Sequence, residues 1–135
     1  MQKFPFFDLT RQYETLKDEV QAKVQTVFNK QAFVMGEEVV KFEEEVAQYI
    51  GVKHAVTCSS GTDALVLAMK GLGIGPGDEV LTPPFSFFAS TSSILLAGAT
   101  PVFIDIDPVT FNIDPAKLGA AVTEKTKAIM PVHLF

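Results

Sequence analysis

The chain has 135 residues and a formal net charge of −5, with 47% hydrophobic and 20% charged residues. A chain of this length and composition can bury a hydrophobic core, which excludes a disordered protein. Its acidic balance and scattered basic residues argue against a nucleic-acid partner, because affinity for nucleic acids depends mainly on Lys and Arg neutralising phosphates.

The first part of the chain predicts two helices. Over residues 8–30, apolar side chains recur at steps of three and four, which is typical of a helix with one apolar face. A second helix is expected over residues 37–50, because glutamates occupy its first turn and Gly51 can end it. The run Glu43-Glu44-Glu45 within it is expected to be a solvated face.

The rest of the chain alternates between short strands and helices. Strands are expected at 54–58, 79–82, 101–106 and 127–134, and helices at 63–70, 89–97 and 115–122. This regular alternation predicts βαβ units, and therefore an α/β fold with a mostly parallel sheet flanked by helices and preceded by two helices. The helix at 63–70 is apolar almost all round, so we expect it to be buried.

We treat residues 1–135 as a single segment, with the N-terminal helices in 1–51 and the βαβ region in 52–135. The last strand pattern runs to Phe135, and no helix follows it to cover that side of the sheet. We therefore expect the chain to be a truncated part of a larger domain.

Cys58 is the only cysteine in the sequence, which rules out an internal disulfide and fits a reducing cytosol. We expect its thiol to be buried, because no polarising neighbour is evident. Residues 1–8 lack the apolar run of a signal peptide, and no stretch approaches the roughly 18 apolar residues of a membrane helix. A cytoplasmic protein without a membrane partner is therefore expected.

The turn from Cys58 to Asp63 is the first candidate binding site. It lies where a predicted strand ends and a helix begins, and ligands of open α/β sheets bind at such places. Free amides of a first helical turn can hold an anion, and the hydroxyls of Ser60 and Thr62 can add hydrogen bonds, while Gly61 allows close approach. The same residues are also favoured in an ordinary helix cap, so composition and spacing alone leave both interpretations open.

The second candidate is the loop at 82–91, which follows the next predicted strand. It carries three phenylalanines, of which Phe85 and Phe88 are expected to pack in the core. An exposed ring at a strand end could instead stack on a flat ligand. A metal site is not expected, because His54 and His133 are far apart in sequence and no set of ligands has suitable spacing.

Several short motifs follow one another along almost the whole chain. They are Gly36-x-x-Val39-x-x-Phe42-Glu43, Ala47-x-Tyr49-x-Gly51, Ser60-Gly61-Thr62-Asp63-Ala64-Leu65, Gly75-x-Gly77-Asp78-Glu79-Val80, Thr82-Pro83, Pro101-Val102-Phe103-Ile104-Asp105-Ile106-Asp107 and Asn112-Ile113-Asp114-Pro115. Each motif is weak alone, but together they closely resemble the DegT/DnrJ/EryC1/StrS family of sugar aminotransferases.

The resemblance implies the N-terminal part of the large domain of a fold-type-I enzyme that uses pyridoxal 5′-phosphate (PLP). It implies that Ser60, Gly61 and Thr62 bind the phosphate of PLP and that the ring of Phe87 stacks on the pyridine ring. The implied reaction transfers an amino group, typically from glutamate, to a keto-sugar linked to a nucleotide, for the synthesis of polysaccharide, lipopolysaccharide or amino sugars. The implied partners are this nucleotide-sugar substrate, the amino donor and a second subunit, in a homodimer with the active site at the interface.

In the family, the lysine that bonds to PLP and the aspartate that pairs with its ring nitrogen lie downstream of the strand that ends at Phe135. No catalytic residue is therefore expected within this chain, and we expect the 135-residue piece to be inactive alone. Two alternatives stay open. One is a PLP-dependent sugar dehydratase of the same family, and the other is a non-catalytic α/β module that binds a phosphate-bearing ligand.

Overall fold

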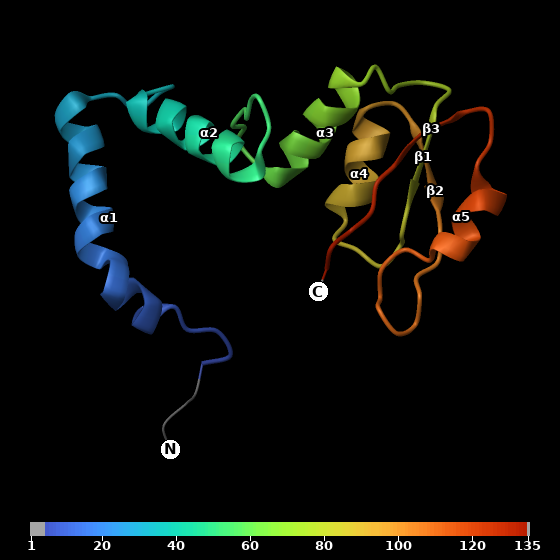
Figure 1. Ribbon diagram of the computed structural model, residues 1–135, viewed down its shortest axis with the longest axis horizontal. Coiled ribbons are helices and arrows are strands. Elements are labelled where there is room, and N and C mark those ends of the chain that lie inside the picture. The colour runs from blue at the N-terminus through green and yellow to red at the C-terminus, as the bar shows by residue number, and fades with distance from the viewer. Residues whose placement is uncertain (1–4, 135) are drawn as a thin grey trace. The chain divides into compact units, whose positions relative to one another are not determined.

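The structure is a computed structural model that describes residues 5–134. The chain divides between Thr57 and Cys58 into two compact units (Figure 1). Residues 1–4, at the start of the predicted N-terminal region, and Phe135, at the end of the predicted last strand, lie outside the described residues. Among residues 5–134, no helix combines the length and the apolar character that a membrane span requires.

The first unit contains the two expected helices, α1 (Thr10–Lys30) and α2 (Glu37–Ile50). The turn before α1 is held by the Asp8 carboxylate, which accepts a hydrogen bond of 2.8 Å from the amide of Thr10. Gly51 ends α2 with a left-handed φ of 77°, a conformation that costs glycine little. Both predicted helices are confirmed.

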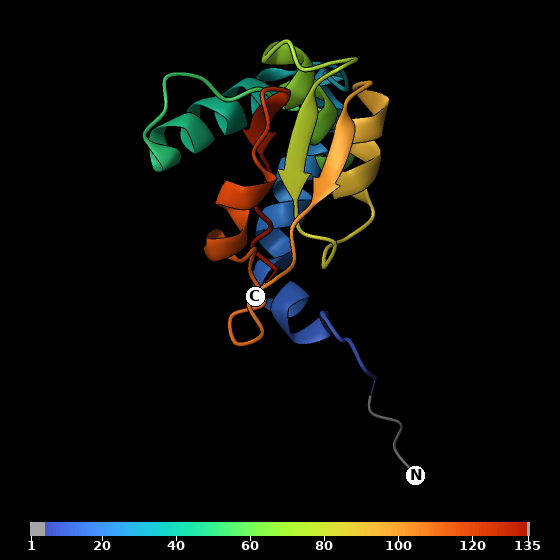
Figure 2. The same cartoon turned by 90° about the vertical axis from the view of Figure 1, so that its right-hand side faces the viewer.

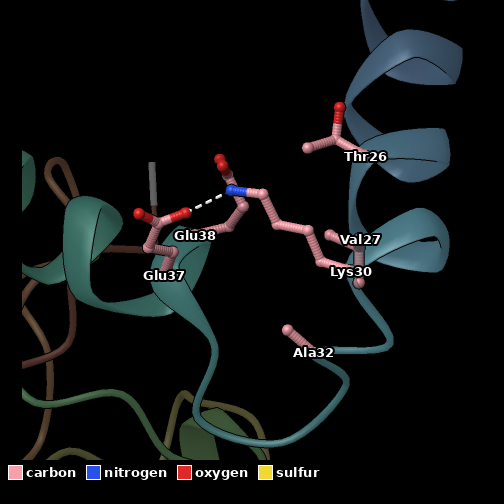
Figure 3. Close-up of a pocket in the computed structure, with 6 residues that line it drawn as sticks. All are labelled: Thr26, Val27, Lys30, Ala32, Glu37 and Glu38. Carbon is pink, nitrogen blue, oxygen red and sulfur yellow. Dashed lines mark hydrogen bonds and ion pairs between the residues drawn. The ribbon is translucent and has the colours of Figure 1, made fainter.

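Ion pairs connect the end of α1 to the start of α2. Lys30 bonds to Glu37, and Lys23 and Lys41 both approach Glu38, at 3.5 and 3.4 Å. Figure 3 shows the Lys30 side chain reaching across the connection to the Glu37 carboxylate, beside a pocket of about 10 Å³. A volume of this size accommodates about one water molecule, so this pocket is a feature of the helix connection and not a ligand site.

Residues 54–58 do not form the predicted strand. The amide and the hydroxyl of Thr57 both donate to the Glu43 carboxylate, at 2.7 and 2.8 Å, so this amide is satisfied by a side chain and not by a neighbouring strand. These bonds, the backbone one first, hold the pKa of Glu43 below its ordinary value. The solvated face predicted for the glutamate run is therefore correct for Glu44 and Glu45, which are exposed, but wrong for the half-buried Glu43.

The second unit is built on a three-stranded parallel sheet, in the order β2-β1-β3. The strands are β1 (Glu79–Thr82), β2 (Thr100–Phe103) and β3 (Thr126–Ile129). Figure 2 shows the central β1 arrow between β2 and β3, with all three pointing the same way. The predicted α/β class and parallel sheet are confirmed, although β2 and β3 end earlier than the sequence pattern predicts.

Three helices accompany the sheet: α3 (Gly61–Gly71), α4 (Ala89–Leu96) and α5 (Pro115–Ala121). Helix α3 packs on α4, and α4 packs on β1 and β2. Helix α5 begins as predicted, because the Asp114 carboxylate accepts from the amide of Ala116 at 2.9 Å and Pro115 stands at the first position.

The core of the second unit lies between the sheet and the helices α3 and α4. Its buried residues are Met69, Ile74, Val80, Ile94 and Ala99. The prediction that α3 is buried all round is wrong, because Met69 is its only buried residue and Leu67 is more than half exposed. Helix α3 therefore presents one side to the core and leaves its first turn accessible.

Candidate functional site

A concavity of about 460 Å³ lies at the beginning of α3 and the end of the loop that follows β1. Helix α3 contributes Gly61, Thr62 and Leu65 to its wall. The loop after β1 and helix α4 contribute Ser86, Phe87, Ala89 and Ser90, and Val132 and Leu134 complete the lining. No charged side chain is among these residues, so an anion bound here would be held by dipoles and hydrogen-bond donors.

The first turn of α3 offers two free amide donors to this concavity. The residue at the N-cap, Ser60, is extended (φ −159°, ψ 164°), and its hydroxyl oxygen accepts from the amide of Asp63 at 3.1 Å. The next amide, of Ala64, makes the ordinary helical bond to the Ser60 carbonyl at 3.0 Å. Within residues 5–134, the amides of Gly61 and Thr62 have no acceptor. One turn thus contains both an ordinary helix cap and two amides that are free to bind an anion.

The Ser60 hydroxyl takes part in the cap and is not part of the cavity lining. It donates to the Asp63 carboxylate at 2.8 Å, and Ser59 donates to the same oxygen at 2.5 Å. These two bonds, the Ser59 bond first, hold the pKa of Asp63 below its ordinary value. Of the predicted phosphate ligands, Gly61 and Thr62 line the concavity, whereas the Ser60 side chain bonds to Asp63 within the turn.

The ring of Phe87 lines the same concavity and is 76% exposed. The prediction that Phe85 and Phe88 lie in the core is wrong, because they are 42% and 72% exposed. The loop after β1 turns at the surface, where Phe85 packs against Phe111 with ring centroids 5.8 Å apart and Phe88 immediately precedes α4. The structure thus brings Phe87 together with Gly61 and Thr62, although these residues belong to different elements.

Among the residues of the concavity that were not singled out from the sequence, two carry hydroxyl groups. Ser86 and Ser90 lie within the candidate loop, and their hydroxyl oxygens are 2.6 Å apart. Their spacing of four residues, at a loop-to-helix junction, is the one signal that could have placed them on a common face. Together with Thr62, they supply the polar side chains of a wall that is otherwise largely apolar.

Cys58 is exposed, which contradicts the predicted burial. It precedes α3 in an irregular segment, and its thiol lies 3.3 Å from the Ser60 carbonyl oxygen. A residue in an irregular surface segment has no sheet neighbours to cover it, and the absence of the predicted strand explains its exposure. Among the described residues, no group of His, Cys, Asp or Glu side chains is arranged to hold a metal ion.

Comparison with known proteins gives consistent results. The sequence model of the DegT/DnrJ/EryC1/StrS aminotransferase family matches residues 14–135. A pleiotropic regulatory protein of Geobacillus stearothermophilus is 53% identical over 131 residues, which are 97% of this chain and 35% of the relative. A UDP-2-acetamido-2-deoxy-3-oxo-D-glucuronate aminotransferase of Pseudomonas aeruginosa is 45% identical over 130 residues, 96% of this chain and 36% of the relative.

The fold also matches solved structures. The crystal structure of NtdA from Bacillus subtilis with the bound cofactor PMP superposes with a TM-score of 0.92 and 36% sequence identity, covering 99% of this chain and 31% of that chain. Such a match confirms the predicted fold class over essentially the whole chain. The chain spans about a third of the length of the curated relatives it matches.

Proposed function

Because the chain belongs to the DegT/DnrJ/EryC1/StrS aminotransferase family, we propose that it forms the N-terminal third of a PLP-dependent sugar aminotransferase. The complete protein transfers an amino group, typically from glutamate, to a keto-sugar linked to a nucleotide. The similarity to the Pseudomonas aeruginosa aminotransferase, which is named for a UDP-linked keto-sugar acid, supports this class of substrate. The observation that carries the proposal is the pair of unpaired amides beside the exposed Phe87 ring in one concavity.

The residues of the concavity fit the parts of PLP. The amides of Gly61 and Thr62, at the positive end of α3, suit a dianionic phosphate. The ring of Phe87 suits the pyridine ring, because aromatic rings attract one another in offset or edge-on arrangements. In this proposal Ser60 acts by holding the turn through its bonds with Asp63, and the residues 52–135 form the cofactor-binding part of the large domain.

Bound PLP supplies an electrophilic carbon and an electron sink for amino transfer. This chain's residues bind and orient it: the first turn of α3 holds the phosphate, and Phe87 limits the tilt of the ring. No lysine and no carboxylate lines the described concavity. In this proposal the lysine and the aspartate lie in sequence beyond Phe135, as the resemblance to the family implies, and the 135-residue piece is inactive alone.

The proposal includes a cytoplasmic homodimer with its active sites at the subunit interface. None of the residues of α1 is buried, and its apolar stripe is accessible along its length. That stripe comprises Tyr13, Leu16, Val20, Val24 and Phe28. An accessible apolar stripe supports the presence of a further protein surface over it, because such surfaces are unfavourable in water. The free, exposed thiol of Cys58 supports a reducing compartment.

The test is amino transfer by the complete gene product, supplied with PLP, glutamate and a panel of nucleotide-linked keto-sugars. We expect 2-oxoglutarate and an amino sugar in equal amounts, detected by mass spectrometry. Loss of water from the sugar without amino transfer would indicate the dehydratase instead. PLP or phosphate binding without any turnover would indicate the non-catalytic module.

The location of the lysine is tested separately with the 135-residue chain. The chain is mixed with PLP, reduced with borohydride and digested for peptide mass analysis. We expect no stoichiometric label on any single lysine. One lysine that carries one label per chain would contradict the proposal that the reactive amine lies beyond Phe135.

A further inference from the structure

The hydroxyl groups of Ser86 and Ser90 form a close pair in the wall of the concavity. Their oxygens are 2.6 Å apart, and both residues line the cavity. A serine hydroxyl carries one hydrogen, so a single hydrogen lies between the two oxygens. The other hydroxyl hydrogen of the pair must point elsewhere, and its direction decides which serine can donate to a ligand.

Burial separates the two hydroxyls. Ser90 is 7% exposed, whereas Ser86 is only half-buried. Either oxygen can be the donor of the bond between them. When Ser90 donates, its hydrogen is satisfied and the hydrogen of Ser86 is left at the more accessible side. Ser86 is therefore the better placed of the two to donate to a ligand.

We propose that Ser86 donates its hydroxyl hydrogen to an anionic oxygen of the bound cofactor, and that Ser90 is a positioning residue that orients this donor. The proposal rests on the proposed function, because it takes PLP as the ligand. The wall beside Ser86 is apolar at Leu65, Phe87 and Ala89, and the free amides of Gly61 and Thr62 are further donors in the same concavity. Accepting a hydrogen bond from Ser90 also polarises the Ser86 hydroxyl and strengthens its own donation.

The test measures the dissociation constant of PLP in the complete gene product. Ser86→Ala removes the donor, and we expect binding to weaken about tenfold, as for a hydrogen bond to a charged acceptor. Ser90→Ala leaves the donor but not its orientation, so a smaller loss of about threefold is expected. Ser86→Thr keeps the hydroxyl and should retain the affinity of the wild type. Thermal unfolding of every variant checks that the fold is intact.

A double-mutant cycle separates positioning from independent contact. Because Ser90 acts through Ser86, the Ser90→Ala change should have no further effect once Ser86 is alanine. Ser92→Ala is the matched control, since Ser92 lies on the same helix but does not line the concavity. Additive losses in the double variant would overturn the positioning role, and unchanged affinity in Ser86→Ala would overturn the donor role.

Two oxygen anions of PLP could accept the hydrogen, namely the phosphate and the ring oxygen. Titration with inorganic phosphate and with the 3-O-methyl ether of PLP distinguishes them. If the phosphate is the acceptor, Ser86→Ala weakens the binding of inorganic phosphate. If the ring oxygen is the acceptor, Ser86→Ala leaves the binding of the ether unchanged. Failure of the proposed function differs from failure of this inference. If the wild type binds neither PLP nor phosphate, both the proposed function and this inference are rejected. If the wild type binds PLP and Ser86→Ala binds it equally tightly, only the inference is rejected.

Discussion

Replacement of Gly61 by proline tests the phosphate site by deleting one amide hydrogen. Gly61 is the first residue of α3, where proline is tolerated because its φ is helical and that amide makes no intrahelical bond. Proline also disfavours a helical conformation in the residue before it, but Ser60 is already extended, with φ −159° and ψ 164°. A Cβ at position 61 meets no atom within 4 Å. The substitution is therefore compatible with the fold.

The expected loss follows from the number of donors. Two amides, of Gly61 and Thr62, are free in this turn, and Gly61→Pro removes one of them. A hydrogen bond to a charged group contributes about 1.5–3 kcal/mol. Since about 1.4 kcal/mol corresponds to a tenfold change in affinity, PLP and inorganic phosphate should each bind about tenfold more weakly or worse.

Equilibrium titration with both ligands measures this loss, and thermal unfolding verifies the fold. Gly61→Ala keeps the amide and its Cβ meets no protein atom within 4 Å, so it measures the effect of an added side chain in the concavity apart from the loss of the amide. If Gly61→Pro binds inorganic phosphate as tightly as the wild type, the first turn of α3 is not the phosphate site.

Three further predictions follow from individual side chains. Phe87→Leu should weaken PLP binding about threefold to tenfold, with little change in inorganic phosphate binding or stability. Phe88 is similarly exposed but lies outside the concavity, so Phe88→Leu should leave the binding of both ligands unchanged. Titration with each ligand measures both variants. Ile94→Ala should lower the free energy of unfolding by about 2–5 kcal/mol in urea titrations, because Ile94 is fully buried, whereas exposed Leu95→Ala should cost far less. The Asp63 carboxylate has a lowered pKa, so its contribution to stability is present above the ordinary pKa of 3.8 and is lost as the pH falls through the pKa of the folded state. The difference in unfolding free energy between wild type and Asp63→Asn should therefore shrink on acidification. A difference that is constant with pH would contradict this assignment.

The elements with clear boundary residues were predictable from the sequence. Helix α2 spans the predicted residues 37–50, because Gly51 adopts the left-handed conformation that ends it. Strand β1 spans the predicted 79–82, because Pro83 follows and lacks the amide that a continuing strand would need. In each case a backbone restriction at one residue sets the limit, and such restrictions are visible in a single sequence.

The wrong predictions concern what surrounds a residue. The segment 54–58 has the composition of a strand, but the amide of Thr57 bonds to Glu43, and a contact across 14 residues leaves no periodic signal. Phe85 and Phe88 are large and apolar, yet they lie on a surface loop. Hydrophobicity predicts a preference for burial. The neighbours that can bury a side chain are set by tertiary structure, and composition does not show them.

The candidate site divides into groups that fix the backbone and groups that remain free. Ser60 and Asp63 satisfy each other, and this mutual bonding leaves the amides of Gly61 and Thr62 as the unpaired donors of the turn. A turn in which every group was free would have to be ordered when a ligand binds, and that ordering would reduce affinity. The same logic applies to the proposed role of Ser90 in orienting the Ser86 hydroxyl. Binding strength at this site should therefore be as sensitive to the residues that hold the donors as to the donors themselves.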